Sequence, residues 1–503
     1  MMKSKQRYMH NKSDLLRGVV TWLYIAHTGL YSPLTMAQDL TLPTQGVVRQ
    51  GQVTIEQTAG AMQINQLSTR SVINWQTFNV GKDAVVNFKQ PSSSAVTLNR
   101  VTGNTPSQIL GSVNANGQVF LVNSSGVYFG GGAHVNVGAL VASTQSISDG
   151  QFISGQYEFV QNQSGVIINN GAISGGYLAL IAPQITNTGT LSATRGDAVL
   201  ASGQNVALNI SPSGRIKVSM SDSEAQSLIT NSGSVEAQQT VQFKANAVQT
   251  VIDQSIKTPS SIDQLVTTNG VVRMVRSSGT IKGQDVTISA GSGSANIDGA
   301  IDVSQTNSKA GSISISGVET EIGANAFLNA QGTLGGGNIW VGGEWQGQGE
   351  MQQAVYTTIA PGAVLDASAT VYGDGGTIVA WSDITNPLSK TYANGKFQAL
   401  GGVNGGDGGQ IETSGYFLNV DNIAINTQSF GGNNGLWLLD PFDITIGDTA
   451  SGTAYANSFV ADEASFIQAS TVASALNAGT NVSISTGDQS ANTISINSAI
   501  TKT

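Results

Sequence analysis

The feature that most constrains the fold is a series of short β-branched and aromatic runs with no helix between them. Residues 96–142 show it best, since VTLNRV, QVFLVN and HVNVGALVA are separated only by turn-forming residues. QVTIEQ, AMQINQ and AVVNFK, nearer the amino end, alternate apolar and polar residues as half-buried strands do. Parallel strands without connecting helices are satisfied by coiling into a solenoid. The sequence therefore predicts an all-β solenoid whose first open edge is capped by the strands from Gln45 onward.

The same pattern continues beyond residue 150, with apolar runs and Asn-Gly or Thr-Gly turns through residues 164–210. A second array starts near residue 271. The last Gly before the second strand of each of its units is Gly311, Gly337, Gly376 or Gly409, at spacings of 26, 39 and 33. Unequal spacing around a constant element predicts turns of a coil with loops inserted on one side. Residues 222–270, the most charged portion, are expected to leave the coil, with AVQTVIDQSI as a helix or excursion.

The side-chain inventory suits a stacked coil better than a compact enzyme. Charged residues make up 11% of the 503 residues, against roughly 25% in ordinary domains, so Asn, Gln, Ser and Thr must carry the surface. Such residues stack in ladders, where rows of like charge would repel. The chain has no Cys, which excludes disulfides, thiolate zinc sites and cysteine nucleophiles.

The amino end has the pattern of an export signal. Five basic residues precede the apolar run Val19 to Ala26, and Thr35-Met36-Ala37 approaches the small-x-small cleavage pattern. We expect a signal peptide over residues 1–37, cut after Ala37. An uncleaved membrane anchor is disfavoured because the run is well short of the ~20 residues that cross a bilayer. Removal of the signal peptide takes away five basic residues and one acidic residue, which leaves 17 basic and 30 acidic residues and a net charge of −13. Such a charge argues against binding to nucleic acid.

Three consecutive stretches carry a family resemblance. SVINWQTFNVG (71–81), VNFKQPSSSAVTLNRVTG (86–103) and PSQILGSVNANGQVFLVNSSGVYFG (106–130) resemble the secretion domain of filamentous haemagglutinin-type exoproteins, which Gram-negative bacteria export by two-partner secretion. The resemblance implies a right-handed parallel β-helix. It also implies that a dedicated outer-membrane transporter binds the amino-terminal part, which nucleates folding at the cell surface.

The resemblance also implies where the transporter is recognised. We assign this role to Asn99 and Arg100 and to the turn Asn123, Ser124, Ser125 and Gly126. Family members usually carry Asn-Pro-Asn-Gly at this turn, and some carry an additional Asn-Pro-Asn-Leu that this chain lacks. Loss of the Pro is expected to loosen the turn without abolishing it, because Asn and Gly at its ends favour tight turns.

The predicted layout has six parts. They are the signal peptide (1–37), the two-partner secretion domain (38–150), a continuation of the β-helix (151–221), the excursion (222–270), a second array (271–434) and a closing segment (435–503). The closing segment begins with GLWLLDPFDITIG, which also resembles an element of these exoproteins. SFIQASTVASALNAGTNVSISTG then predicts a helix, a Gly turn and a strand. Because the chain stops in strand-like sequence, we expect it to lack a distal functional region.

The sequence predicts no catalytic, cofactor-binding or metal-binding residues. His134 is the single His outside the predicted signal peptide, and a lone His on a strand is more often structural. The carboxylates that stand near equivalent turns of neighbouring repeats are Asp366, Asp374, Asp407 and Glu412. They suit a polysaccharide-degrading site or, more commonly, turn capping. The GGDGG and GDGG turns lack the nine-residue period of calcium-binding β-rolls.

Four tryptophans, Trp340, Trp345, Trp381 and Trp437, suit either exposed sugar platforms or rings stacked inside the coil. Taken together, the sequence predicts a secreted or surface-bound adhesin without enzymatic activity or cofactor, exported through the periplasm. Its expected partners are the transporter and a host-cell or carbohydrate receptor. Two alternatives stay open: a β-helical polysaccharide-degrading enzyme, and the delivery stalk of a contact-dependent toxin.

Overall fold

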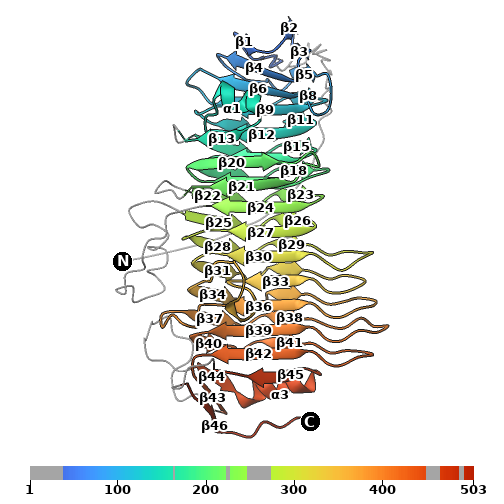
Figure 1. Cartoon of the computed structure of the whole chain (residues 1–503), viewed down its shortest axis with the longest axis vertical. Coiled ribbons are helices and arrows are strands. Elements are labelled where there is room, and N and C mark those ends of the chain that lie inside the picture. Colours follow the sequence, from blue (N-terminus) through green and yellow to red (C-terminus); the bar gives the residue numbers. More distant parts are fainter. Residues whose placement is uncertain (1–37, 162–164, 222–226, 246–272, 449–464, 487–491) are drawn as a thin grey trace, which may run out of the picture. The chain divides into compact units, whose positions relative to one another are not determined.

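Each turn of the chain adds one short strand to each of three long sheets, which we call sheets I, II and III (Figure 1). The computed structural model describes residues 38–161, 165–221, 227–245, 273–448, 465–486 and 492–503. The chain divides into two compact units, 1–38 and 39–503, and the three sheets belong to the second. Among the described residues, eleven turns in succession repeat the order sheet III, sheet II, sheet I.

Sheet I has fifteen strands, and each is hydrogen-bonded to its neighbours in the sheet. In spatial order they are β1 (Val47–Gln50), β4 (Arg70–Trp75), β6 (Val96–Val101), β9 (Gln118–Val122), β12 (Ala139–Ser143), β16 (Leu178–Ile181), β19 (Ala198–Ser202), β24 (Thr240–Ala245), β27 (Asp285–Ser289), β30 (Ser312–Ser316), β33 (Asn338–Val341), β36 (Thr377–Trp381), β39 (Gln410–Gly415), β42 (Leu436–Pro441) and β45 (Asn481–Ile484).

Sheet II has fourteen strands. They are β2 (Val53–Thr58), β3 (Ala61–Gln66), β5 (Val85–Lys89), β8 (Ser112–Ala115), β11 (His134–Asn136), β15 (Ala172–Gly175), β18 (Thr190–Ala193), β23 (Ser234–Ala237), β26 (Thr280–Lys282), β29 (Ala300–Asp302), β32 (Phe327–Asn329), β35 (Val364–Asp366), β38 (Lys396–Gln398) and β41 (Ala424–Asn426).

Sheet III has eleven strands. They are β7 (Ser107–Ile109), β10 (Val127–Phe129), β14 (Val166–Asn169), β17 (Gln184–Asn187), β22 (Ser227–Asn231), β25 (Arg273–Ser277), β28 (Ser294–Ile297), β31 (Glu319–Ile322), β34 (Tyr356–Ile359), β37 (Lys390–Ala393) and β40 (Phe417–Asn419).

The interior of the coil is a set of apolar columns, because every turn places its inward side chain on that of the turn before. The shortest turn, from Ile167 to its partner Ile185, is 18 residues long. In sheet II one buried residue per strand makes an unbroken column: Ile173, Leu191, Val235, Ile281, Ile301, Leu328, Leu365, Phe397 and Ile425. Each turn therefore buries apolar surface only against its two neighbours. The predicted right-handed parallel β-helix is confirmed.

The amino-terminal cap that the sequence predicts is also present. β1 pairs antiparallel with β4, and β2 pairs antiparallel with β3, whereas the strand pairs along the coil are parallel. The reversal occupies hydrogen-bonding groups that the first parallel strands would otherwise leave unpaired at an open edge.

A buried ladder of asparagines runs up sheet III. The Nδ2 of Asn169 donates to the Oδ1 of Asn187 at 2.8 Å, and the Nδ2 of Asn187 donates to the Oδ1 of Asn231 at 2.8 Å. Asn231 continues the ladder to the Oγ of Ser277 at 3.2 Å. Asn169, Asn187 and Asn231 have no exposed surface. The ladder confirms the expectation that amide side chains stack along the axis, each satisfying the next. It differs from the expected surface ladders in lying inside the coil.

Replacing Asn187 by Ala is expected to lower the free energy of unfolding by about 2 kcal/mol, because it leaves the buried amide groups of Asn169 and Asn231 without their ladder partner. Urea unfolding monitored by circular dichroism measures the change. Asn136→Ala, at an exposed strand position, is the control and is expected to change stability by less than about 0.5 kcal/mol. Equal midpoints for the two variants would contradict a stabilising ladder.

An outer layer, which the sequence did not predict, covers one face of sheet I. It consists of α1 (Asp149–Ser154) and an antiparallel outer sheet of β13 (Tyr157–Val160), β20 (Asn205–Ile210) and β21 (Ile216–Met220). Phe152, Phe159 and Val206 pack on outward side chains of sheet I, such as Leu98 and Phe120, in a second hydrophobic cluster. The expectation that NVALNI would form another turn of the coil is therefore wrong, because it forms β20 of the outer sheet.

The expected excursion at 222–270 does not hold for residues 227–245. These residues form β22, β23 and β24, one strand in each main sheet, with Ile229, Val235 and Phe243 buried in the core. Their alternation of apolar and polar residues matches the other turns, which explains their place in the coil. Residues 222–226 and 246–272, including the AVQTVIDQSI segment, lie outside the described residues.

The last described turn replaces its sheet II strand by a helix. β44 (Ser465–Gln468) is followed by α3 (Ala469–Asn477) and then β45, so the predicted helix, Gly turn and strand are confirmed. Val472 and Ala475 of α3 are buried in the main core. β44 also forms a small parallel sheet with β43 (Ile444–Gly447) and β46 (Ile494–Ile496).

Candidate functional site

Asn99, the first predicted recognition residue, lies inside the coil. It is on β6 and has no exposed surface. Its Oδ1 accepts a hydrogen bond from the Nε1 of Trp75 at 3.0 Å, and its Nδ2 donates to the carbonyl oxygen of Phe120 at 3.3 Å. Asn99 therefore ties three successive strands of sheet I together and does not face a partner in the folded protein.

Arg100, the next residue, points to the opposite face of sheet I and holds α1. Its Nη1 lies 2.6 Å from the Oδ1 of Asp149, at the start of α1, and its Nη2 donates to the carbonyl oxygen of Ile147 at 2.7 Å. The helix is also held by a capping box, in which Ser148 and Gln151 satisfy each other's backbone N–H groups. Because Arg100 is half-buried in these contacts, it serves to dock the outer layer.

The predicted turn at Asn123 to Gly126 forms without the proline. The Oδ1 of Asn123 accepts from the N–H of Ser125 at 3.0 Å, and the N–H of Gly126 donates to the carbonyl oxygen of Asn123 at 3.0 Å. Gly126 has a φ of 123°, which favours glycine over other residues. Asn123 is fully buried and its Nδ2 donates to Thr105 and Ser107, so the side chains of Ser124 and Ser125 alone remain partly accessible in this turn.

The structure brings these two groups of residues close together. Arg100 on β6 pairs in register with Val122 on β9, the residue before Asn123. The six predicted recognition residues therefore lie at one corner of neighbouring turns, but three of them, Asn99, Asn123 and Gly126, are buried in the folded chain.

The four candidate carboxylates do not converge on one site. Asp374 and Asp407 lie in stacked loops and cap backbone groups: Asp374 accepts from the N–H of Asp407 at 2.7 Å, and Asp407 accepts from the N–H of Asn433 at 2.7 Å. Asp366 accepts from the N–H of Ser368 at 3.0 Å and from Gln331 of the preceding turn at 2.8 Å. These contacts are those of the turn-capping interpretation.

Glu412 lies on a strand, β39, and not at a turn as the sequence pattern suggested. Its carboxylate has no exposed surface and faces outward under η3 (Trp345–Gly347). The Oε2 accepts from the N–H of Gln346 at 2.7 Å, and the Oε1 accepts from the Oγ of Ser414 at 2.9 Å. Burial raises the pKa of Glu412 to about 7, and these hydrogen bonds oppose part of that rise.

Two of the four tryptophans are buried and two are partly exposed. Trp437 is fully buried in the main core, where its Nε1 donates to the Oγ1 of Thr413 at 3.0 Å. Trp381 is covered by the loop after β33, and its Nε1 donates to Gln353 at 3.1 Å. Neither can serve as a sugar platform. Trp340 and Trp345 keep partly exposed rings.

Within the described ranges, no group of three or more His, Asp or Glu side chains is placed to hold a metal ion. His134 is exposed on β11. The helices of the described part are also shorter or less apolar than a membrane-spanning helix requires. The predicted signal peptide, with its cut after Ala37, lies outside the described residues.

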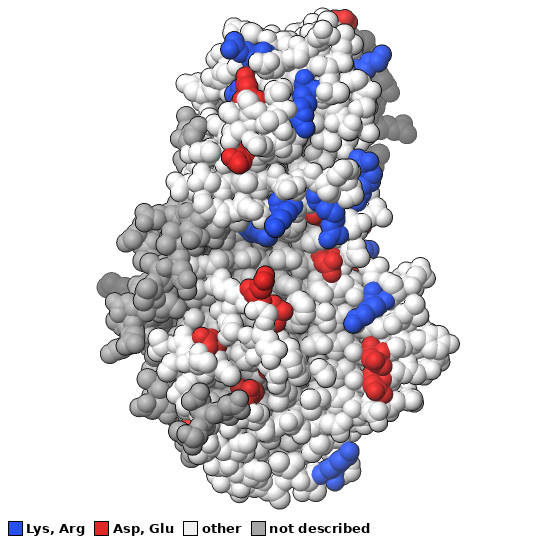
Figure 2. Space-filling view, in the orientation of Figure 1, with Lys and Arg blue, Asp and Glu red and all other residues white. Residues whose placement is uncertain are grey.

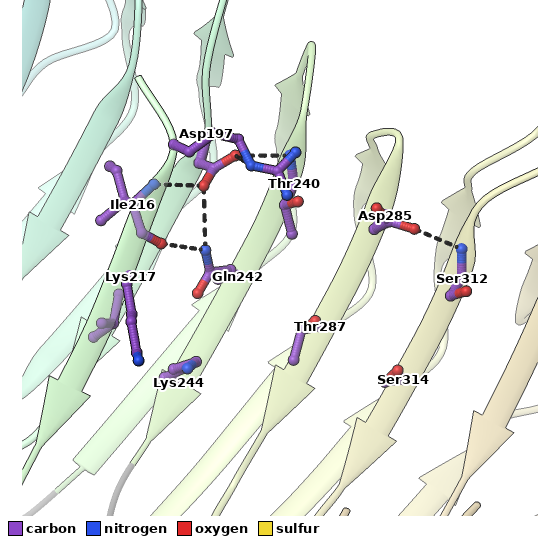
Figure 3. A pocket seen from close by; sticks show the side chains of 12 residues that line it. Asp197, Ile216, Lys217, Thr240, Gln242, Lys244, Asp285, Thr287, Ser312 and Ser314 are labelled. Carbon is purple, nitrogen blue, oxygen red and sulfur yellow. Dashed lines mark hydrogen bonds and ion pairs between the residues drawn. The ribbon is translucent and has the colours of Figure 1, made fainter. Parts of the chain in front are cut away.

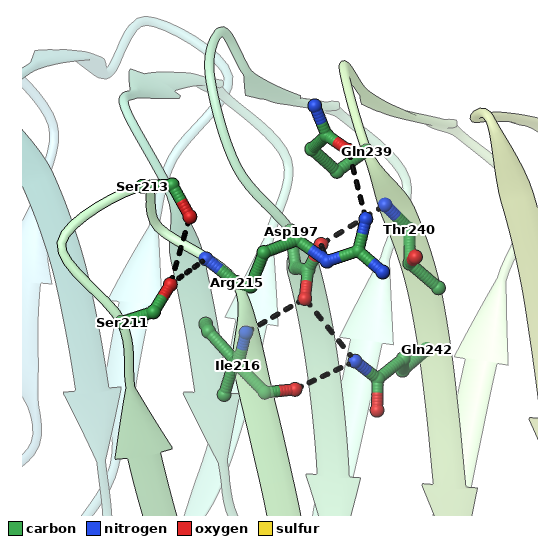
Figure 4. Close-up of polar contacts among 8 residues, drawn as sticks. All are labelled: Asp197, Ser211, Ser213, Arg215, Ile216, Gln239, Thr240 and Gln242. Atoms are coloured by element: carbon green, nitrogen blue, oxygen red, sulfur yellow. Dashed lines mark hydrogen bonds and ion pairs between the residues drawn. The ribbon is translucent and has the colours of Figure 1, made fainter.

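Sequence reasoning missed Asp197, which fastens the outer sheet to the coil (Figure 4). Its buried carboxylate accepts from the N–H of Ile216 on β21 at 2.7 Å and from the N–H of Thr240 on β24 at 3.0 Å. The Nε of Arg215 lies 3.7 Å from the Oδ1 of Asp197. The Gly-Asp pair at 196–197 resembles any turn, so the sequence carried no signal for this role.

A hollow of about 500 Å³ opens beside Asp197, between β21 and the outward face of β24, β27 and β30 (Figure 3). Its lining is polar and includes Lys217, Lys244, Thr287 and Ser314. The face shown in Figure 2 is otherwise mostly uncharged, in keeping with the composition.

The comparisons with known proteins agree with this geometry. Residues 37–282 match the family model of the TPS secretion domain. The chain carries a two-partner secretion (TPS) domain. The matched range extends through the outer layer to β26, past residue 150, and the predicted six-part layout stays a prediction. Chains with such a domain are exported through the periplasm and across the outer membrane by a dedicated transporter.

The crystal structure of the HMW1 secretion domain from Haemophilus influenzae is similar, with a TM-score of 0.66 and 25% identity, over 79% of this chain and 100% of that one. Two proteins named heme/hemopexin-binding protein, both from Haemophilus influenzae, are also similar. One is 32% identical over 218 residues, covering 41% of this chain and 24% of the relative. The other is 30% identical over 252 residues, covering 45% and 26%. The match thus spans about a quarter of either relative's length.

Proposed function

We propose that this TPS exoprotein is an adhesin. We also propose that its transporter recognises Asn99, Arg100 and the turn Asn123 to Gly126 before the chain folds. The observation that carries the second part is burial: Asn99 and Asn123 have no exposed surface once the coil has formed. Direct contact with these residues requires the unfolded chain. Folding outside the cell then buries them, and each new turn that packs on the last disfavours return to the periplasm.

Secretion of the full-length chain, with and without the transporter, tests this proposal. Deletion of residues 96–142 is expected to abolish secretion. Asn123→Ala and the double change of Ser124 and Ser125 to Ala are expected to reduce it, with the protein retained in the periplasm. Ser92→Ala with Ser94→Ala, in another exposed turn of the same domain, is the control. Secretion that proceeds without the transporter would contradict the proposal.

A second measurement distinguishes an effect of these substitutions on folding from an effect on recognition by the transporter. The two serines are partly accessible, so their loss is expected to leave the unfolding free energy of purified protein within about 0.5 kcal/mol of wild type. A secretion defect at unchanged stability supports recognition. A defect that merely follows lost stability assigns these residues to folding alone.

The adhesin part draws support from the stacked loops beyond the matched domain. Four successive loops, after β32, β35, β38 and β41, each expose one large apolar side chain: Leu334, Tyr372, Val403 and Phe430, at 53% to 57%. Neighbouring loops are joined by backbone hydrogen bonds, such as Tyr372 N–H to Thr333 and Asn404 N–H to Val371. A row of exposed apolar side chains on a secreted protein is typical of a binding surface.

Changing all four side chains to Ser is expected to leave secretion intact and to reduce binding of the secreted protein to epithelial cells. Four exposed polar positions of sheet II, changed to Ala, provide the control. Undiminished cell binding by the four-Ser variant would contradict a role for this row in adhesion.

The names of the two relatives favour a second candidate, binding of heme or hemopexin. Immobilised hemopexin and free heme, each offered to the secreted chain, distinguish it from adhesion. Saturable binding of either, together with no binding to cells, would replace the adhesin proposal.

A further inference from the structure

The hollow beside β21 contains two lysines that have no acidic partner among the described residues. Lys217 lies on β21 of the outer sheet and Lys244 on β24 of sheet I, and Figure 3 shows both at the same end of the hollow. Neither lysine takes part in an ion pair within the described ranges, whereas Arg215, which also lines the hollow, lies 3.7 Å from Asp197. Two neighbouring ammonium groups repel each other, and an anion bound between them offsets that repulsion.

The environment of Lys244 makes the absence of an anionic partner unfavourable. Its side chain is half-buried, and burial lowers the pKa of Lys244, with the positive charge of Lys217 adding to the effect. A desolvated ammonium group that keeps its charge gains most from an anionic partner.

The acidic groups of the hollow are already engaged at its other end. Asp197 accepts from Ile216 and Thr240, and Asp285 accepts from the N–H of Ser312 at 2.9 Å. Between the two ends lies a row of outward side chains in register: Gln242, Thr287 and Ser314. The Nε2 of Gln242 already donates to the carbonyl oxygen of Ile216 and to Asp197. The hydroxyls of Thr287 and Ser314 are therefore the groups of this row that can donate to a ligand held by the lysines.

We propose that this hollow is a binding site for a phosphate group, held between Lys217 and Lys244 and contacted by the hydroxyls of Thr287 and Ser314. Two ammonium groups match the two negative charges of a phosphate or phosphate monoester, and hydroxyl donors from neighbouring strands supply further hydrogen bonds to its oxygens. The site needs the outer sheet, because Lys217 comes from β21. It goes beyond the proposed function, since neither secretion nor adhesion assigns a ligand to this hollow.

Calorimetric titration of the purified full-length chain tests the site, with ionic strength held constant by NaCl. The probes are inorganic phosphate, glycerol 3-phosphate and acetate. We expect saturable binding of a phosphate probe at about 1 mM or tighter, and acetate roughly tenfold weaker because it carries one charge. Preference for glycerol 3-phosphate over inorganic phosphate identifies an esterified phosphate as the natural ligand, and the reverse identifies free phosphate.

Lys217→Gln and Lys244→Gln are each expected to weaken phosphate binding roughly tenfold or more, and the double variant to abolish it. Lys282→Gln, an exposed lysine on sheet II, is the matched control and is expected to bind as wild type does. Loss of an unneutralised charge is also expected to leave Lys244→Gln at least as stable as wild type without phosphate, which shows that it folds. The proposal is overturned if no phosphate probe binds saturably, or if the double variant binds as the control does.

Discussion

Replacing Trp75 by Ala is expected to lower the free energy of unfolding by about 4 to 6 kcal/mol, the largest effect of the substitutions considered. Trp75 is buried in the turn that the amino-terminal cap covers, and its ring packs edge-on against Phe78 with centroids 5.6 Å apart. Removal of the ring leaves a cavity and deprives the buried Oδ1 of Asn99 of its donor. Urea unfolding monitored by circular dichroism measures the loss.

Two further variants separate the causes. Trp75→Phe keeps most of the ring but not the donor, so it is expected to cost about 1 to 3 kcal/mol, the range for an unpaired buried acceptor. Trp340→Ala removes an outward, partly exposed ring and is expected to cost less than about 1 kcal/mol. If Trp75→Ala and Trp340→Ala unfold at the same midpoint, the inward placement of Trp75 is wrong.

The second large effect is a dependence of stability on pH through Glu412. The folded-state pKa is about 7, above the ordinary value of 4.5, so the folded chain binds this proton more tightly than the unfolded chain. The resulting stabilisation is fully present below pH 4.5 and is lost as the pH rises through 7. It amounts to about 3 kcal/mol, from about 1.36 kcal/mol per pKa unit.

Glu412→Gln removes this dependence, because the amide stays neutral while its oxygen can still accept from the N–H of Gln346. Relative to wild type, the variant is expected to gain about 3 kcal/mol between about pH 4.5 and pH 8. Hydrogen exchange of the Gln346 amide reports the same change locally, since η3 rests on this carboxylate. Glu321→Gln, on partly exposed β31, is the control. A wild-type and variant difference that stays constant with pH would contradict a raised pKa.

The loop over Glu412 also depends on glycine at one position. Gly347 has a φ of 64°, and a Cβ there would lie 2.5 Å from the ring of Trp381. The close approach lets the loop cover Trp381 and Glu412 together. No sequence pattern distinguishes this glycine from the many others in the loops.

The sequence alone determined the coil, its cap and the stacking of amide side chains along its axis, but not the burial of the asparagine ladder. Alternation such as AMQINQ specifies which side chains share a face, and Asn-x-Gly corners such as Asn187 to Gly189 specify where the chain bends. These are local properties, repeated in every turn, so they are readable without knowledge of the neighbours. The resemblance of residues 71–130 to a secretion domain was readable for the same reason.

Tertiary structure alone decided which strands join the coil and which lie outside it. NVALNI and IKVSM alternate like any turn, yet they form β20 and β21 of the outer sheet. The outer layer explains why strands of sheet I such as ALVAS and LALI are almost continuously apolar: they are buried on both faces. Period-two alternation fixes a face but not the partner that covers it. The burial of Asn99, the environment of Glu412 and the meeting of Lys217 with Lys244 all depend on that partner, so only the folded chain reveals them.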